Sequence, residues 1–138
     1  CGEGASKQRL TAMARGLGNI RFLSLQPIDR LNELLNLADI HLLPQRADAE
    51  DLVMPSKLTA ILASGRPVIA TVRKGTQIAN AVKDCGVVVD PGDAVGMRNA
   101  ITELLGNTEW RTTLGKAGRD YAIAHWNKNG ILSRAAWW

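Results

Sequence analysis

Apolar residues recur along the chain in short continuous runs that alternate with helical spacings. Leu10, Met13, Ala14 and Leu17 stand at i, i+3, i+4 and i+7, which predicts an amphipathic helix. The continuous apolar runs, bounded by turn residues, predict short buried strands. The pattern predicts strands over 20–23, 39–43, 67–72 and 86–89. It predicts helices over 6–17, 56–64 and 76–84, a helix that opens at Pro27 and carries an apolar stripe at 31–38, and two last helices with apolar stripes at 97–105 and 114–122.

Strands that alternate with amphipathic helices are typical of β-α units and a parallel sheet. The sequence shows no internal repeat and no linker, so we expect one α/β domain over residues 1–138, with a Rossmann-like sheet covered by helices on both faces. Ligands of such sheets bind outside the carboxyl ends of the strands. The loops of interest therefore follow the predicted strands, at 2–6, 24–27, 44–56, 73–77 and 90–93.

Local signals mark several ends of these elements. Gly65 can end the helix that precedes it in a left-handed conformation. Thr76 and Asp93 each precede an apolar helical stripe and can cap it. Pro27 suits the first turn of a helix, and Pro44 is expected to stop the strand before it.

Composition and charge exclude several classes of protein. Two cysteines, Cys1 and Cys85, are too few for a disulfide framework or a four-cysteine zinc site, which favours a reducing cytoplasm. No apolar run reaches the roughly 18–20 residues of a membrane span. The net charge of +4 is compatible with phosphate-bearing ligands, while no nucleic-acid-binding motif is present. The cations of the last helix, Arg111, Lys116 and Arg119, indicate a solvated helix face.

Gly2 and Gly4 stand before the first predicted helix, at a position where a strand should already have ended. We therefore expect the chain to begin within a β-α unit of a longer protein. Lys7 occupies the place of the third glycine in a dinucleotide-binding fingerprint, which argues against a dehydrogenase. The two glycines predict either a tight strand-to-helix turn or a contact with a phosphate.

The segment from Glu50 to Pro67 carries the most chemistry. Pro55 leads into a helix whose first N–H groups have no partner within the helix, so they attract an anion at the carboxyl edge of the sheet. Ser56 adds a hydroxyl and Lys57 adds a positive charge. Glu50 and Asp51 could accept hydrogen bonds from sugar hydroxyls nearby. The alternative interpretation is a capped helix with a solvent-exposed lysine and a charged loop.

Several motifs resemble one known family when they are taken in order along 1–126. They are the glycines of Cys1–Gly4, the sequence Ala38-Asp39-Ile40 with Leu43-Pro44, the sequence Pro55-Ser56-Lys57, the run Ala63-Ser64-Gly65-Arg66-Pro67, and Pro91-Gly92-Asp93. Together they resemble the C-terminal, nucleotide-sugar-binding half of family-4-type (group 1) glycosyltransferases of the GT-B architecture. Within that family they are most similar to the colanic-acid and exopolysaccharide fucosyltransferases.

The resemblance implies a retaining transfer of a sugar from a GDP- or UDP-linked donor, without a metal or other cofactor. It implies that Glu50 and Asp51 contact the donor sugar. The implied diphosphate ligands are Gly2, Gly4, Pro55, Ser56 and Lys57; the implied nucleoside contacts are Leu25, Gln26, Pro44, Leu58 and Ala60; and Gly75 and Thr76 form the implied donor loop.

This chain departs from the family pattern at the second acid of a Glu-x7-Glu signature. That acid should fall at Leu58 or at Ala60, depending on the motif used for counting, and neither residue is acidic. The cations that usually grip the diphosphate would precede Cys1. We therefore expect the chain alone to bind a nucleoside diphosphate weakly and to transfer no sugar, with a lipid-linked or oligosaccharide acceptor bound by an N-terminal domain. The parent enzyme is expected to be cytoplasmic, or peripheral at the inner membrane face.

Two other interpretations share the architecture. A nucleotide-sugar epimerase would need paired acid and base groups, for which the sequence offers Glu50, Asp51 and His41. A receiver-like or other ligand-binding module would need acids at the carboxyl end of a strand, whereas Asp39 precedes its strand. His41 is more typical of a packed or hydrogen-bonded core residue, His125 of the surface, and Cys85 of a small apolar core residue.

Overall fold

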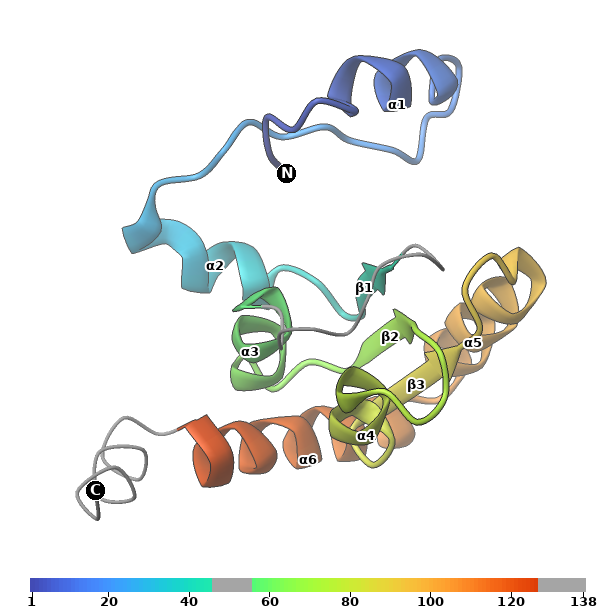
Figure 1. Ribbon diagram of the computed structural model, residues 1–138. Helices are drawn as coiled ribbons and strands as arrows, with labels where there is room; N and C mark the ends of the chain where they lie inside the picture. Colours follow the sequence, from blue (N-terminus) through green and yellow to red (C-terminus); the bar gives the residue numbers. More distant parts are fainter. Residues whose placement is uncertain (46–55, 127–138) are drawn as a thin grey trace. The chain divides into compact units, whose positions relative to one another are not determined.

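The computed structural model describes residues 1–45 and 56–126, shown in colour in Figure 1. The chain divides into two compact units, Cys1–Leu34 and Leu35–Trp138. Helix α1 (Lys7–Met13) and the 3-10 helix η1 (Ile28–Arg30) belong to the first unit. Helix α2 (Leu31–Asn36) runs across the boundary between the two units.

The second unit is built on a parallel sheet in the order β1-β2-β3. Its strands are β1 (His41–Pro44), β2 (Val68–Thr71) and β3 (Gly86–Val89). The register pairs Leu42 with Ile69 and Ile69 with Val87. Helices α3 (Ser56–Ala63) and α4 (Gln77–Val82) connect successive strands, and α5 (Ala94–Gly106) and α6 (Thr108–Trp126) follow β3.

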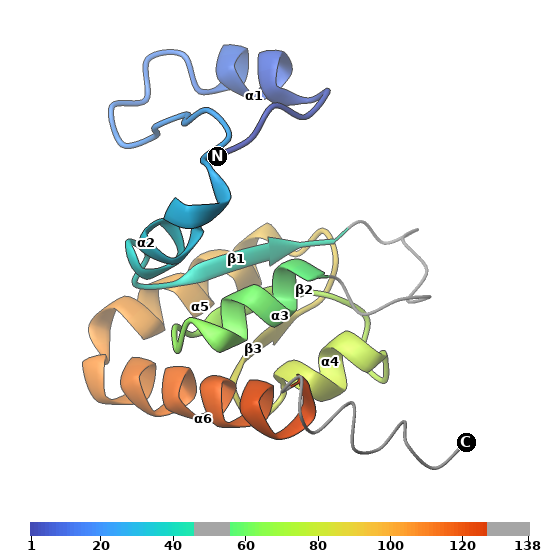
Figure 2. The ribbon, with the colours of Figure 1, turned by 90° about the vertical axis from the view of Figure 1, so that its left-hand side faces the viewer.

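Strand β2 is buried on both faces, which explains its unbroken apolar sequence. Its side chains alternate between two cores. Val68 and Ala70 pack with residues of α3, α4 and α6, whereas Ile69 packs with Leu104 of α5 and Leu114 of α6. Figure 2 shows α3 in front of the sheet and α5 behind it. The predicted α/β sheet with helices on both faces is therefore confirmed.

The signals at the ends of elements are confirmed where local chemistry sets them. Gly65 follows α3 with φ +73°, the left-handed conformation that ends a helix. The Thr76 hydroxyl accepts a hydrogen bond from the Ala79 N–H and caps α4. The Asp93 carboxylate does the same for α5, through the N–H of Gly96.

The strand predicted over 20–23 is wrong. These residues have no ladder in the described structure, and one backbone hydrogen bond, from Gly2 N–H to Leu23 C=O, holds the segment. An apolar run becomes a strand only where a neighbouring strand pairs with it. The first helix is also shorter than predicted, since α1 ends at Met13. Strand β1 starts at His41, after Asp39 and Ile40, and Pro44 is its last residue.

None of the helices in the described ranges is long and apolar enough to cross a membrane.

Candidate functional site

The carboxyl ends of the three strands lie at one edge of the sheet, because the strands are parallel. Thr71, the last residue of β2, links two of these strand ends. Its hydroxyl accepts a hydrogen bond from the Gln45 N–H at 2.8 Å and donates one to the Gln45 carbonyl at 3.2 Å. Thr71 is 7% exposed. The loop after β1 therefore begins from a fixed backbone position, and the sequence analysis did not single out this residue.

The predicted donor loop follows β2 and forms a closed turn. The Thr76 hydroxyl donates to the Arg73 carbonyl at 2.8 Å and accepts from Ala79 N–H at 3.1 Å. Gly75 has φ +85°, a conformation that a residue with a side chain rarely adopts. The turn thus presents backbone groups at the carboxyl edge in a defined geometry. Contact of Gly75 and Thr76 with the donor stays a prediction.

A second closed turn follows β3. The Asp93 N–H donates to the Asp90 carbonyl at 3.1 Å, and Gly92 has φ +85°. The Asp93 carboxylate accepts from Gly96 N–H at 2.8 Å. A Cβ at Gly96 would overlap that carboxylate, so a residue with a side chain there would require the Asp93 side chain to shift.

Helix α3 begins with Ser56 and Lys57, both exposed. It connects β1 to the parallel strand β2, so its N-terminus lies at the carboxyl edge. The N–H groups of its first turn have no acceptor within the helix, and the helix dipole places positive charge there. The structure thus places the predicted anion-binding residues, Ser56 and Lys57, at the edge where the turns at 73–76 and 90–93 also lie.

The other predicted site residues on β1 and α3 differ in their burial. Leu58 is fully buried and belongs to the core of the second unit, and Ala60 is partly buried. Their predicted nucleoside contacts stay predictions. Pro44 is exposed at the end of β1, as a nucleoside contact requires. Glu50, Asp51 and Pro55 lie outside the described residues.

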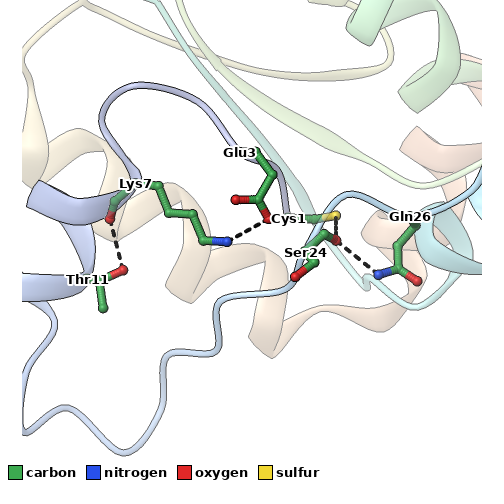
Figure 3. A network of polar contacts seen from close by, with 6 residues as sticks. All are labelled: Cys1, Glu3, Lys7, Thr11, Ser24 and Gln26. Atoms are coloured by element: carbon green, nitrogen blue, oxygen red, sulfur yellow. Dashed lines mark hydrogen bonds and ion pairs between the residues drawn. The ribbon is translucent and has the colours of Figure 1, made fainter.

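The first unit holds the remaining predicted contacts, Gly2, Gly4, Leu25 and Gln26. The chain of 22–26 runs beside the opening residues. Gly2 N–H donates to Leu23 C=O, and the Ser24 carbonyl accepts from both Cys1 Sγ and Gln26 Nε2 at 3.0 Å (Figure 3). The predicted phosphate turn and the predicted nucleoside loop therefore adjoin one another.

A cavity of about 210 Å³ lies against the opening turn, lined by Gly2, Gly4, Lys7 and Phe22 among others. Lys7 Nζ donates to Glu3 Oε1 at 2.7 Å (Figure 3). This bond lowers the pKa of the Glu3 carboxyl, and contacts with Ser24 and Leu25 lower it further. Leu25 itself is 73% exposed. Gly2 and Gly4 belong to one unit and Ser56 and Lys57 to the other, so their joint binding of one diphosphate stays a prediction.

The positions predicted for three side chains outside the candidate site are confirmed. His41 opens β1 at the opposite edge of the sheet, and its Nε2 lies 3.0 Å from the Leu35 carbonyl. Burial lowers the pKa of His41, and the nearby charge of Arg66 lowers it further, against the effect of that hydrogen bond. Cys85 is 2% exposed, and burial raises the pKa of its thiol to about 11. His125 is exposed.

Within 1–45 and 56–126, no three histidine, cysteine or acidic side chains gather in a way that could hold a metal ion.

The family model for group 1 glycosyl transferases matches residues 1–107. Over 136 residues, 95% of this chain, the sequence is 35% identical to WcaI of Escherichia coli K12, a glycosyl transferase named for colanic acid biosynthesis. The chain spans 32% of the length of that relative.

Two solved structures resemble the fold. The sucrose-phosphate synthase of Thermosynechococcus elongatus superposes with a TM-score of 0.81 at 26% identity, over 96% of this chain and 33% of that one. Anabaena HepE, solved in complex with UDP-glucose, superposes with a TM-score of 0.70 at 17% identity, over 94% of this chain and 36% of that one. The chain thus has the fold of the C-terminal half of a GT-B glycosyltransferase.

Proposed function

Because the chain belongs to the group 1 glycosyltransferases, we propose that it forms the donor-binding part of an enzyme that transfers a sugar from a GDP- or UDP-linked donor. The observation that carries this proposal is the start of α3, where Ser56 and Lys57 stand exposed at the carboxyl edge. The N–H groups of a helix start and an adjacent ammonium suit a diphosphate. UDP-glucose bound in HepE, a protein of the same fold, supports a nucleotide sugar as the ligand.

The proposed chemistry needs the negative charge of the leaving diphosphate to be stabilised as the bond to the sugar breaks. Preorganised N–H groups and cations stabilise such charge where it develops. In this proposal, the α3 N-terminus and Lys57 take that role without a metal, and the turns at 73–76 and 90–93 border the sugar. Retention of configuration and contacts of Glu50 and Asp51 with the sugar remain part of the proposal.

We further propose that the parent enzyme acts in the assembly of an exopolysaccharide. The similarity to WcaI supports this pathway. The free cysteines Cys1 and Cys85 support work in a reducing compartment, the cytoplasm. A fucosyl donor and a lipid-linked or oligosaccharide acceptor stay predictions.

Calorimetric titration with GDP and with UDP tests the donor site. Lys57→Ala should weaken nucleotide binding by on the order of 1–3 kcal/mol, the loss expected of a charge-assisted contact. Lys83→Ala is the matched control, because Lys83 is an exposed lysine just after α4, a helix whose C-terminus lies at the other edge of the sheet. Equal affinity of the two variants would place Lys57 in solvent, and no heat with either nucleotide at millimolar concentration would refute the proposal.

A further inference from the structure

A cavity of about 430 Å³ lies at the amino edge of the sheet, opposite the proposed donor site. The loop between α3 and β2 forms one wall, and residues 108–119 of α6 form another. Four cationic side chains line it, namely Arg66, Arg111, Lys116 and Arg119. Asp39 is the one carboxylate among its lining residues.

The sequence of α6 places its cations on one face. Positions 108, 111, 112, 115, 116 and 119 follow helical spacing, so their side chains share one side of the helix. Gly115 lies on that side, and a Cβ there would overlap the Gly65 carbonyl oxygen. This close approach brings the loop with Arg66 against the helix, and a Cβ at Gly65 would stand within van der Waals distance of the Arg119 side chain.

Three of the cations are held in place by helix ends. Arg66 donates to the Asn36 carbonyl at the end of α2, and Arg119 donates to the Ala63 carbonyl at the end of α3. Arg111 donates to the Leu104 and Leu105 carbonyls near the end of α5. The contacts of Arg119 and Arg111 correct the prediction that the cations of α6 form a merely solvated helix face.

These contacts leave hydrogen-bond donors of the cationic side chains available to a ligand. A guanidinium has five N–H donors in a planar fork, and the contacts of Arg66 and Arg119 with helix carbonyls each occupy one. Holding the guanidinium at a helix end also reduces the side-chain freedom that a ligand would have to restrict. Lys116 pairs with Asp120 on the exposed side of α6, at 2.6 Å. With Asp39 and Asp120 both counted against the four cations, the cavity keeps an excess of positive charge.

We propose that this cavity is a second anion site, which binds a phosphate-bearing ligand separately from the nucleotide sugar. Arginine forks match phosphate oxygens in pairs, and the Thr108 hydroxyl at the cavity, which accepts a hydrogen bond from Arg111, offers a further donor. The volume exceeds that of a bare phosphate and falls in the range of small-molecule sites. The phosphate belongs to a free metabolite or to the headgroup of an anionic lipid, and one experiment separates the two.

The experiment uses the isotopically labelled chain and follows backbone amide resonances during titration with inorganic pyrophosphate. The amides of Gly65 and Lys116 should move. Lys116→Glu should weaken this response about tenfold, as expected for loss of a charge-assisted contact, whereas Lys83→Glu makes the same charge change outside the cavity and should leave it unchanged. Arg119→Gln is a second variant that keeps a donor near the Ala63 carbonyl. Because the readout is at the amino edge, it does not depend on nucleotide binding at Lys57.

Cosedimentation with vesicles of phosphatidylglycerol and phosphatidylcholine forms the second arm. A pyrophosphate response that Lys116→Glu weakens and Lys83→Glu does not supports a free phosphate ligand. Vesicle binding with the same dependence, without a pyrophosphate response at Gly65, supports a lipid headgroup. If neither probe binds, or if both variants lose binding equally, the cavity is not an anion site and the proposal is overturned.

Discussion

Thr71→Val should measure how firmly the loop after β1 is tied to the sheet. The substitution keeps the shape of a β-branched side chain but removes the hydroxyl that both accepts from and donates to the Gln45 backbone. The first of these bonds, an N–H···O bond of 2.8 Å, is short, and the second, an O–H···O bond of 3.2 Å, is longer than is usual for its type. Thr71 is buried, so water cannot readily replace its hydroxyl.

The expected cost is about 1–3 kcal/mol in the free energy of unfolding, the range for leaving buried polar groups without a partner. Gln45 is half-buried, so water can reach part of this residue and the upper end of the range is not expected. Urea titration followed by tryptophan fluorescence is suitable, because all four tryptophans belong to the second unit.

The matched control is Thr102→Val. The Thr102 hydroxyl is exposed on α5 and donates to the Arg98 carbonyl one turn back, where water can substitute for it. We expect a change within about 0.5 kcal/mol, the usual range for surface substitutions. If Thr71→Val were as mild as this control, the bonds to Gln45 would contribute nothing to stability, and the argument for a fixed loop start would fail.

Three further predictions concern packing and titration. Gly115→Ala should destabilise the fold by about 1–3 kcal/mol through overpacking against Gly65, whereas Gly106→Ala, with open space around it, should not; equal urea midpoints would contradict this. Burial raises the pKa of the Cys85 thiol from 9.0 to about 11, so stability should be full below pH 9 and fall as the pH rises toward 11, and Cys85→Ala should flatten that fall. Burial lowers the pKa of His41 below its ordinary 6.5, so the contribution of His41 to the free energy of unfolding should be full above pH 6.5 and fall as the pH drops. The His41→Asn variant should lack this fall, and identical pH profiles of stability for the variant and the unchanged chain would refute the assignment.

Local chemistry explains which parts of this fold the sequence could predict. The caps at Thr76 and Asp93 and the helix end at Gly65 each depend on residues a few positions apart, so the sequence contains the whole signal. The strand predicted over 20–23 failed because a strand depends on a partner that the apolar pattern does not specify.

The candidate site likewise has features that the sequence could predict and features that it could not. The exposed start of α3 at Ser56 and Lys57 follows from chain order alone, since a helix after a parallel strand must begin at the carboxyl edge. The link between Thr71 and Gln45 joins residues 26 positions apart, and no spacing rule indicates it. The contact of Arg119 with Ala63 spans 56 positions. The sequence could therefore show the cationic face of α6 but not its contact with the C-terminal end of α3.

The polarity of a β-α fold gives the two edges of its sheet opposite electrostatic character. Helices that follow parallel strands point their N-termini, with positive dipole ends, toward the carboxyl edge, and their C-termini toward the amino edge. Anions are therefore favoured at the first edge, where α3 begins with Lys57, and disfavoured at the second unless cations intervene. In this chain Arg119 and Arg111 lie on the helix ends of α3 and α5. These arginines stabilise the helix ends and also reverse the charge of the amino edge. Substitution of either arginine would consequently disturb both a helix end and the proposed anion site. Lys116 pairs with Asp120 alone in the described contacts, so its substitution tests the proposed anion site without removing a contact to a helix end.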